Sequence, residues 1–184
     1  MRGWKAWGLL LVLPPLAATA QGGAHHLSGS NTEVGLEVQH LGLRLFGADF
    51  RILEGDFALG REDGGADLRV TVEVSSIDSH SGYWNTQLKS AAWLDTGRYP
   101  TMSFRSTAIT REGPDRARVE GELTLRGVTR PLTLEISDID CPAARSEAGG
   151  CRFRGRGQIR RSDFGLPHGF FQGGDTVQIR LRGH

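Results

Sequence analysis

The sequence has almost no net charge, few aromatic residues and no long apolar run. Its 22 Lys and Arg residues nearly balance its 21 Asp and Glu residues, which leaves a formal net charge of +1 over 184 residues. This balance excludes a domain-wide basic field of the kind that holds a nucleic acid or an anionic membrane. Aromatic residues make up only 8% of the chain. The length indicates one domain rather than two.

The main apolar stretch lies at the start of the chain and has the form of a secretory signal. Arg2 and Lys5 precede an apolar run over 8–18, and Ala18-Thr19-Ala20 has the pattern of a cleavage site. The run is too short to span a bilayer, which takes about 20 residues. We expect residues 1–20 to be a signal peptide cleaved near Ala20, with an uncleaved anchor as the alternative. The mature protein would then be periplasmic or secreted, with a formal charge of −1 and no stable membrane anchor.

Only two cysteines are present, Cys141 and Cys151, and the residues between them have a loop-like composition. An exported protein meets an oxidising compartment, where such a pair forms a disulfide. We expect a bridge at the base of a hairpin, which would stabilise the fold by about 2–3 kcal/mol for so short a loop. The alternative is a redox dithiol, which usually has Cys-x-x-Cys spacing.

Glycine is abundant, with 26 residues, and this excludes a long helical bundle because each interior glycine costs about 1 kcal/mol relative to alanine. Apolar residues alternate with polar ones over long windows, for example from Val34 to His40 and from Ala117 to Leu125. Strict alternation indicates strands with one apolar and one wetted face. Glycine-rich turns separate eight expected strands, near 32–41, 46–59, 67–78, 101–110, 116–126, 130–139, 151–161 and 175–183.

One segment departs from the alternation. Residues 83–95 place Trp84, Leu88, Ala91 and Ala92 at helical spacing, which predicts a short amphipathic helix between the third and fourth strands. Eight antiparallel strands hide their edges best by closing into a barrel, and a barrel of this size can be packed solid or hold one small ligand. The predicted fold is therefore an all-β, eight-stranded antiparallel lipocalin-like barrel.

We expect three regions along the chain, with 1–20 as the signal, 21–30 as a flexible segment and 31–184 as the barrel domain. An outer-membrane barrel is the alternative, but it needs aromatic girdles that the scattered aromatic residues do not supply.

The sequence contains no recognisable catalytic or metal-binding constellation. Asp163-Phe164-Gly165 matches a kinase triplet without the accompanying kinase motifs, and no Gly-x-Ser-x-Gly elbow occurs. The histidines show no paired ligand spacing, so no metal site is expected. His40 continues the apolar face of its strand and should point into the barrel near the strand end. It is either a satisfied core histidine or a polar group at a cavity mouth.

Four stretches, in order along the chain, resemble the YceI-like family of exported, lipocalin-shaped proteins that bind polyisoprenoid lipids. They are Val38-Gln39-His40-Leu41-Gly42, the strand from Tyr99 to Ser106, the hairpin from Gly121 to Leu134, and Arg161-Ser162-Asp163-Phe164-Gly165. The resemblance implies a non-enzymatic carrier whose bound ligand is an isoprenoid lipid or isoprenoid quinone, with no other cofactor and no nucleic acid partner. The resemblance alone suggests a homodimer.

On this interpretation the ligand-binding residues fall into three groups. His40 lies at the mouth, and the covering segment contributes Trp84, Leu88, Trp93 and Leu94. The interior is expected to be lined by Val38, Phe50, Phe57, Val72, Val74, Phe104, Leu123, Leu125 and Phe164.

The covering segment is also where the chain departs from the family pattern. Family members usually carry Arg-Asp-x-His-Leu-Arg/Lys-Ser, whereas this chain has Trp84-Asn85-Thr86-Gln87-Leu88-Lys89-Ser90. The change alters either the ligand head and lid geometry or only a surface polar network, with Trp84 packed over the barrel. Two other functions stay open: a stress-linked or redox-accessory interaction module with a solid barrel, and an enzyme with His40 as general base.

Overall fold

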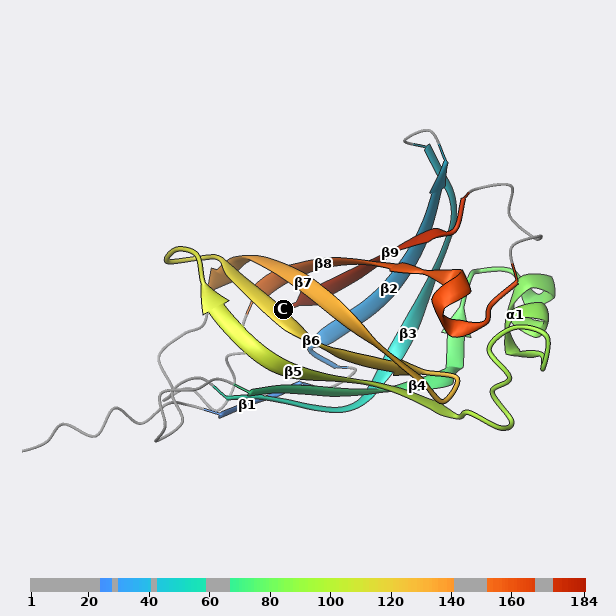
Figure 1. Ribbon diagram of the computed structural model, residues 1–184, viewed down its shortest axis with the longest axis horizontal. Helices are drawn as coiled ribbons and strands as arrows, with labels where there is room; N and C mark the ends of the chain where they lie inside the picture. The colour runs from blue at the N-terminus through green and yellow to red at the C-terminus, as the bar shows by residue number, and fades with distance from the viewer. Residues whose placement is uncertain (1–23, 28–29, 41–42, 59–66, 141–151, 168–173) are drawn as a thin grey trace, which may run out of the picture.

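The chain folds into a closed antiparallel barrel with a short α-helix at one end (Figure 1). The structure, a computed structural model, describes residues 24–27, 30–40, 43–58, 67–140, 152–167 and 174–184. The predicted eight-stranded barrel is confirmed. In chain order the elements are β1 (Ala24–Leu27), β2 (Thr32–His40), β3 (Leu43–Ala58), β4 (Asp67–Asp78), α1 (Gly82–Lys89), β5 (Thr101–Arg111), β6 (Ala117–Leu125), β7 (Val128–Asp140), β8 (Arg152–Arg160), the 3-10 helix η1 (Arg161–Phe164) and β9 (Thr176–Gly183).

The barrel closes through its longest strand, β3. All barrel strands pair antiparallel, in the order β3-β2-β9-β8-β7-β6-β5-β4, and β3 also pairs with β4. The first half of β3 pairs with β2 and its second half pairs with β4, with irregularities in register between Asp49 and Arg51 and between Ile52 and Glu54. Such irregularities bend a strand, so β3 can follow the curve that joins the two edges.

The short strand β1 lies within residues 21–30, the segment we expected to be flexible, and the structure differs there. Its backbone pairs with β3, from Ala24 opposite Ala58 to Leu27 opposite Gly55. The pairing of β2 with the same edge of β3 ends at Arg51. Beyond Arg51 this edge of β3 would present unpaired backbone groups. The strand β1 pairs with it from Gly55 to Ala58.

The alternation seen in the sequence sets the two faces of the wall, because successive side chains of a strand point to opposite sides. In β6, Ala117, Val119, Gly121, Leu123 and Leu125 are buried, and the residues between them are exposed or partly exposed. The apolar face therefore points inward and the charged face points outward.

The helix is shorter than the sequence predicted, and the prediction of a helix to residue 95 is wrong. Ser81 caps its start by accepting from the backbone N–H of Trp84. At the other end Ser90 is extended, and its hydroxyl donates to the carbonyl of Gln87 over 2.6 Å. Serine side chains that bond to the backbone in this way compete with the helix, and α1 stops at Lys89.

Figure 1 shows which parts share the helical end of the barrel. The helix α1, the 3-10 helix η1 and the turn between β6 and β7 lie together there, and the turn between β5 and β6 lies at the opposite end. The turn between β6 and β7 uses left-handed backbone at Arg126 and Gly127, with φ of 51° and 72°. Neither helix among the described residues is long and apolar enough to cross a membrane.

Candidate lipid-binding cavity

The barrel encloses an apolar cavity at its helical end. The volume open to the centre of a water-sized sphere is about 120 Å³, whereas a single water needs about 10–15 Å³ by the same measure. All eight barrel strands contribute to the wall. The described lining residues are Val34, Gly35, Leu36, Val38, Phe46, Phe50, Leu68, Val70, Val72, Ile77, Leu88, Trp93, Leu94, Met102, Ser103, Phe104, Leu123, Leu125, Leu132, Leu134, Ile159, Arg161, Leu166, Val177, Ile179 and Leu181.

Most of the residues that the sequence singled out lie in this wall. They are Val38, Phe50, Val72, Leu88, Trp93, Leu94, Phe104, Leu123 and Leu125. The structure thus brings the strand residues and the covering segment to one space, and contact with a ligand stays a prediction.

Three of the other predicted residues are described but do not line the cavity. Val74 and Phe164 are almost fully buried, and Phe164 borders a shallow outer groove beside Arg130 and Pro131. Trp84 is half-buried, one helical turn before Leu88 on the same face of α1, and its ring packs against Phe46 outside the cavity lining. Their positions indicate packing of the wall and of the lid.

Several predicted side chains fall outside the described part of the chain. His40 is the last residue of β2 and Phe57 lies in β3, but neither side chain is among those described. Cys141 and Cys151, the expected disulfide pair, also lie outside the described residues. The roles assigned to these residues stay predictions.

The lid of the cavity is Leu88 of α1 together with Trp93 and Leu94, which follow the helix. All three are buried. The chain folds back on the helix end, where the N–H of Leu94 donates to the carbonyl of Leu88 over 3.0 Å and the N–H of Trp93 donates to that of Ser90 over 3.0 Å. These bonds turn the two large side chains toward the lumen.

An arginine in the turn between β6 and β7 fastens this lid to the barrel. The guanidinium of Arg126 donates to the carbonyl of Gly165, just after η1, over 2.8 Å and to that of Ala91 in the lid over 3.4 Å. Arginine suits the place because its planar fork can serve two acceptors at once. Three segments far apart in the sequence are thereby held at one end of the barrel.

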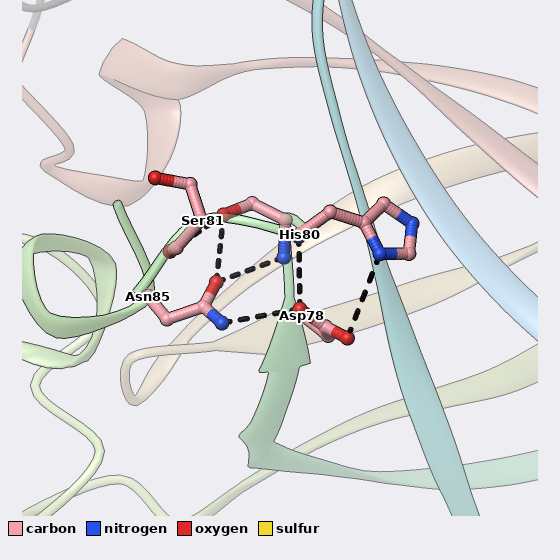
Figure 2. Close-up of polar contacts among 5 residues, drawn as sticks. Asp78, His80, Ser81 and Asn85 are labelled. Carbon is pink, nitrogen blue, oxygen red and sulfur yellow. Dashed lines mark hydrogen bonds and ion pairs between the residues drawn. The ribbon is translucent and has the colours of Figure 1, made fainter. Parts of the chain in front are cut away.

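A polar cluster fixes the start of α1 to the end of β4 (Figure 2). The amide of Asn85 donates to Asp78 over 3.1 Å, and its oxygen accepts from the N–H and the hydroxyl of Ser79 over 2.8 and 2.6 Å. Two hydrogen bonds lower the pKa of Asp78 below its ordinary value of 3.8. The bond from the amide of Asn85 has the larger effect, and the bond from the N–H of His80 has the next largest. Asn85 stands where the family pattern has an aspartate. An aspartate there would place a second carboxylate beside Asp78, whereas the amide of Asn85 donates a hydrogen bond to it.

One charged residue belongs to the cavity wall among the residues described. Arg161, the first residue of η1, is only 3% exposed and donates to the carbonyl of Gly174. Placing a guanidinium against an apolar lumen is costly unless it is hydrogen-bonded, and the bond to the carbonyl of Gly174 supports Arg161 in this position. Neither alternation nor helical spacing gave a signal for this residue, because it lies in a 3-10 turn after the end of a strand.

The chemistry of the wall suits burial of hydrocarbon. In the described part of the chain, no three His, Cys, Asp or Glu side chains come together as a metal site would require. An apolar lumen with a few polar groups at one end is typical of a small-molecule binding site. The described geometry offers shape and apolar surface to a ligand.

Comparison with known proteins gives a family and a set of similar folds. A sequence model of the YceI-like domain matches residues 25–184. Protein YceI of Escherichia coli O157:H7 is 34% identical over 142 residues, covering 75% of this chain and 72% of that protein. The UPF0312 protein VPA0850 of Vibrio parahaemolyticus is 30% identical over 166 residues, covering 88% and 87%.

Two solved structures show the same fold at lower identity. BcnA of Burkholderia cenocepacia superposes with a TM-score of 0.68 at 22% identity, covering 82% of this chain and 94% of that chain. A polyisoprenoid binding domain from Saccharophagus degradans, implicated in plant cell wall breakdown, superposes with a TM-score of 0.61 at 11% identity, covering 88% and 96%.

Proposed function

Because the chain belongs to the YceI-like domain family, we propose that it is a binding protein that holds an isoprenoid lipid or isoprenoid quinone inside its barrel. The observation that supports this most directly is the cavity, whose described wall is apolar apart from Arg161 and Ser103. A solved domain of the same fold is described as polyisoprenoid binding.

The physical reason for binding is the removal of hydrocarbon from water. Burial of apolar surface stabilises a complex by about 25 cal/mol per Å², and a prenyl chain consists almost entirely of such surface. The charged outward face of the strands keeps the complex in solution. Arg161 lies on the lumen wall, where it could donate to the oxygen atoms of a phosphate, hydroxyl or quinone head.

We propose further that the protein acts as a carrier in the periplasm and performs no chemical step on its ligand. The expected signal over residues 1–20 supports export. A barrel working only through its surface would have no use for an open interior, and the cavity therefore favours the carrier over that alternative.

The test is equilibrium binding of a purified radiolabelled polyprenol, separated from free lipid by gel filtration. Val72→Arg places a charge in the lumen, because Val72 is buried and lines the cavity. Its neighbour Thr71 alternates with the buried Val70 and Val72, points to the other face of β4 and does not line the cavity, so Thr71→Arg is the matched control.

We expect the wild type and Thr71→Arg to retain the polyprenol and Val72→Arg to lose it, with circular dichroism showing that all three are folded. Retention of the lipid by a folded Val72→Arg variant would overturn the proposed site. A folded wild type that binds neither a polyprenol nor an isoprenoid quinone would overturn the proposed function.

A further inference from the structure

A second apolar cavity lies at the end of the barrel opposite α1. Its volume open to the centre of a water-sized sphere is about 60 Å³. Its wall includes Ala117 at the start of β6 and Phe153 near the start of β8, and Leu27 of β1 also borders it. Figure 1 places this end of the barrel at the turn between β5 and β6, away from the lid.

The two cavities meet at a neck formed by Leu68, Val70 and Leu181, which border both. Leu68 and Val70 belong to β4 and Leu181 belongs to β9, and these strands are not neighbours in the sheet. Their side chains therefore reach into the lumen from separate parts of the wall. The two cavities and the neck between them follow one another along the barrel lumen, and together we call them the channel.

The short strand β1 contributes to the far cavity a residue that alternation did not predict, Leu27. Leu27 is buried although it lies in the short strand β1, and its Cβ lies close to Gly55 of β3. A side chain at Gly55 would meet Leu27 at 3.1 Å, so the glycine lets β1 approach. The channel thus has a lid at one end and a packed floor at the other.

We propose that the far cavity is a chain-length gauge, in which the tail of a linear prenyl ligand passes the neck and ends against the floor. This rests on the function proposed above and adds a specificity to it. In this proposal the side chains of Leu68, Val70 and Leu181 part to admit a single extended chain and exclude a bulky ring. A close-packed floor yields little to a longer tail, because protein interiors have almost no spare volume.

The polar end of the ligand has its place at the opposite end of the channel. Arg161 is buried and borders the larger cavity, not the far one. The far cavity is bordered by Arg111, but this side chain is exposed and donates to the carbonyl of Pro114 over 2.8 Å. A buried donor for a head that accepts hydrogen bonds therefore lies toward the lid. With the head held there, the distance to the floor determines how many isoprene units fit.

Two substitutions change the depth of the far cavity in opposite directions. Ala117 is buried and borders only the far cavity, and Ala117→Leu fills part of it. Phe153 borders the far cavity and not the larger one, and it also borders a polar groove shared with Asp138 and Arg152. Phe153→Leu enlarges the far cavity. Arg116, next to Ala117, is exposed, so Arg116→Leu adds a leucine without changing the lumen.

The experiment offers each purified full-length variant an equimolar series of linear polyprenols that differ by one isoprene unit, and native mass spectrometry reads which lengths are bound. We expect Ala117→Leu to shift the preferred length down by at least one unit and Phe153→Leu to shift it up, with Arg116→Leu unchanged. Each variant can be judged alone if the other fails to fold.

A folded variant whose length distribution equals that of the wild type would overturn the gauge while leaving the lipid-binding function intact. A wild type that binds polyprenols of every length equally would also overturn it. A wild type that binds no polyprenol at all would instead overturn the underlying function.

Discussion

Trp84 of α1 stands edge-on to Phe46 of β3, with ring centroids 6.2 Å apart and ring planes at 68°. Phe46 lines the larger cavity, so the contact joins the lid helix to the cavity wall. Trp84 replaces an arginine of the family pattern at this place. The departure therefore exchanges a charged residue for an aromatic contact that holds the helix against the barrel.

We expect Trp84→Ala to loosen the lid. An edge-on aromatic pair contributes about 0.5–1.5 kcal/mol beyond its buried area, which corresponds to an increase of about two- to tenfold in the rate of ligand release if the lid must open first. Stopped-flow displacement of a bound fluorescent prenyl analogue measures this rate.

Tyr83→Ala is the control for this prediction. Tyr83 also contacts Trp84, with centroids 5.2 Å apart, but it is 61% exposed and does not touch the cavity. The account is contradicted if removal of Trp84 speeds release no more than removal of Tyr83.

The pKa of Asp78 should depend on Asn85. The hydrogen bond from Asn85 is the largest cause of the lowered pKa, so Asn85→Ala raises the pKa of Asp78 toward 3.8. Because the folded-state pKa is lowered, this contribution to stability is fully present above the ordinary value and is lost as the pH falls through the folded-state value. The difference in unfolding free energy between the wild type and the variant should therefore narrow in acid.

Carbon NMR titration of the Asp78 carboxyl measures the first effect, and urea unfolding at neutral and strongly acid pH measures the second. Thr86→Ala serves as the control, because Thr86 donates to the carbonyl of Gly82 within the helix and does not touch Asp78. An unchanged Asp78 titration in Asn85→Ala would show that the amide does not hold the carboxylate.

Gly121 should tolerate no side chain. A Cβ there would lie 2.5 Å from Cζ of Phe104 and closer still to the backbone oxygen of Arg105. We expect Gly121→Ala to destabilise the fold by about 1–3 kcal/mol, as overpacking does, and to push Phe104 into the cavity that it lines.

Urea unfolding measures the loss, with Gly82→Ala as the comparison, because no atom lies within 4 Å of a Cβ at Gly82. A surface change of that kind stays within about 0.5 kcal/mol. Equal stability of Gly121→Ala and the wild type would mean that the ring and the strand have room to move apart.

The barrel could be predicted from the sequence because side chains alternate between the two faces of a strand in an open sheet and in a closed barrel alike. In β6 every inward residue from Ala117 to Leu125 could be identified from period two alone. The end of the helix could not, because the Ser90 cap competes with a helical pattern that continues through Ala91 and Ala92. The sequence also gave no sign of β1, a four-residue strand whose stability comes from the open edge of β3.

In the candidate site, too, the residues on strands could be predicted from alternation, and those positioned by tertiary packing could not. Strand residues such as Val72 and Leu123 were predictable, since an inward position on a barrel strand faces the lumen. Val74 was assigned to the lumen by the same rule and is instead packed within the wall. Arg161 was missed because its burial follows from tertiary packing of η1 and not from any periodicity.

Native mass spectrometry of the mature protein, released gently from the cells that make it, tests whether the barrel carries a lipid. We expect a mass increase equal to an isoprenoid lipid or isoprenoid quinone, present in the wild type and in Thr71→Arg and absent from folded Val72→Arg. A folded wild-type protein that repeatedly shows no such adduct would contradict the account.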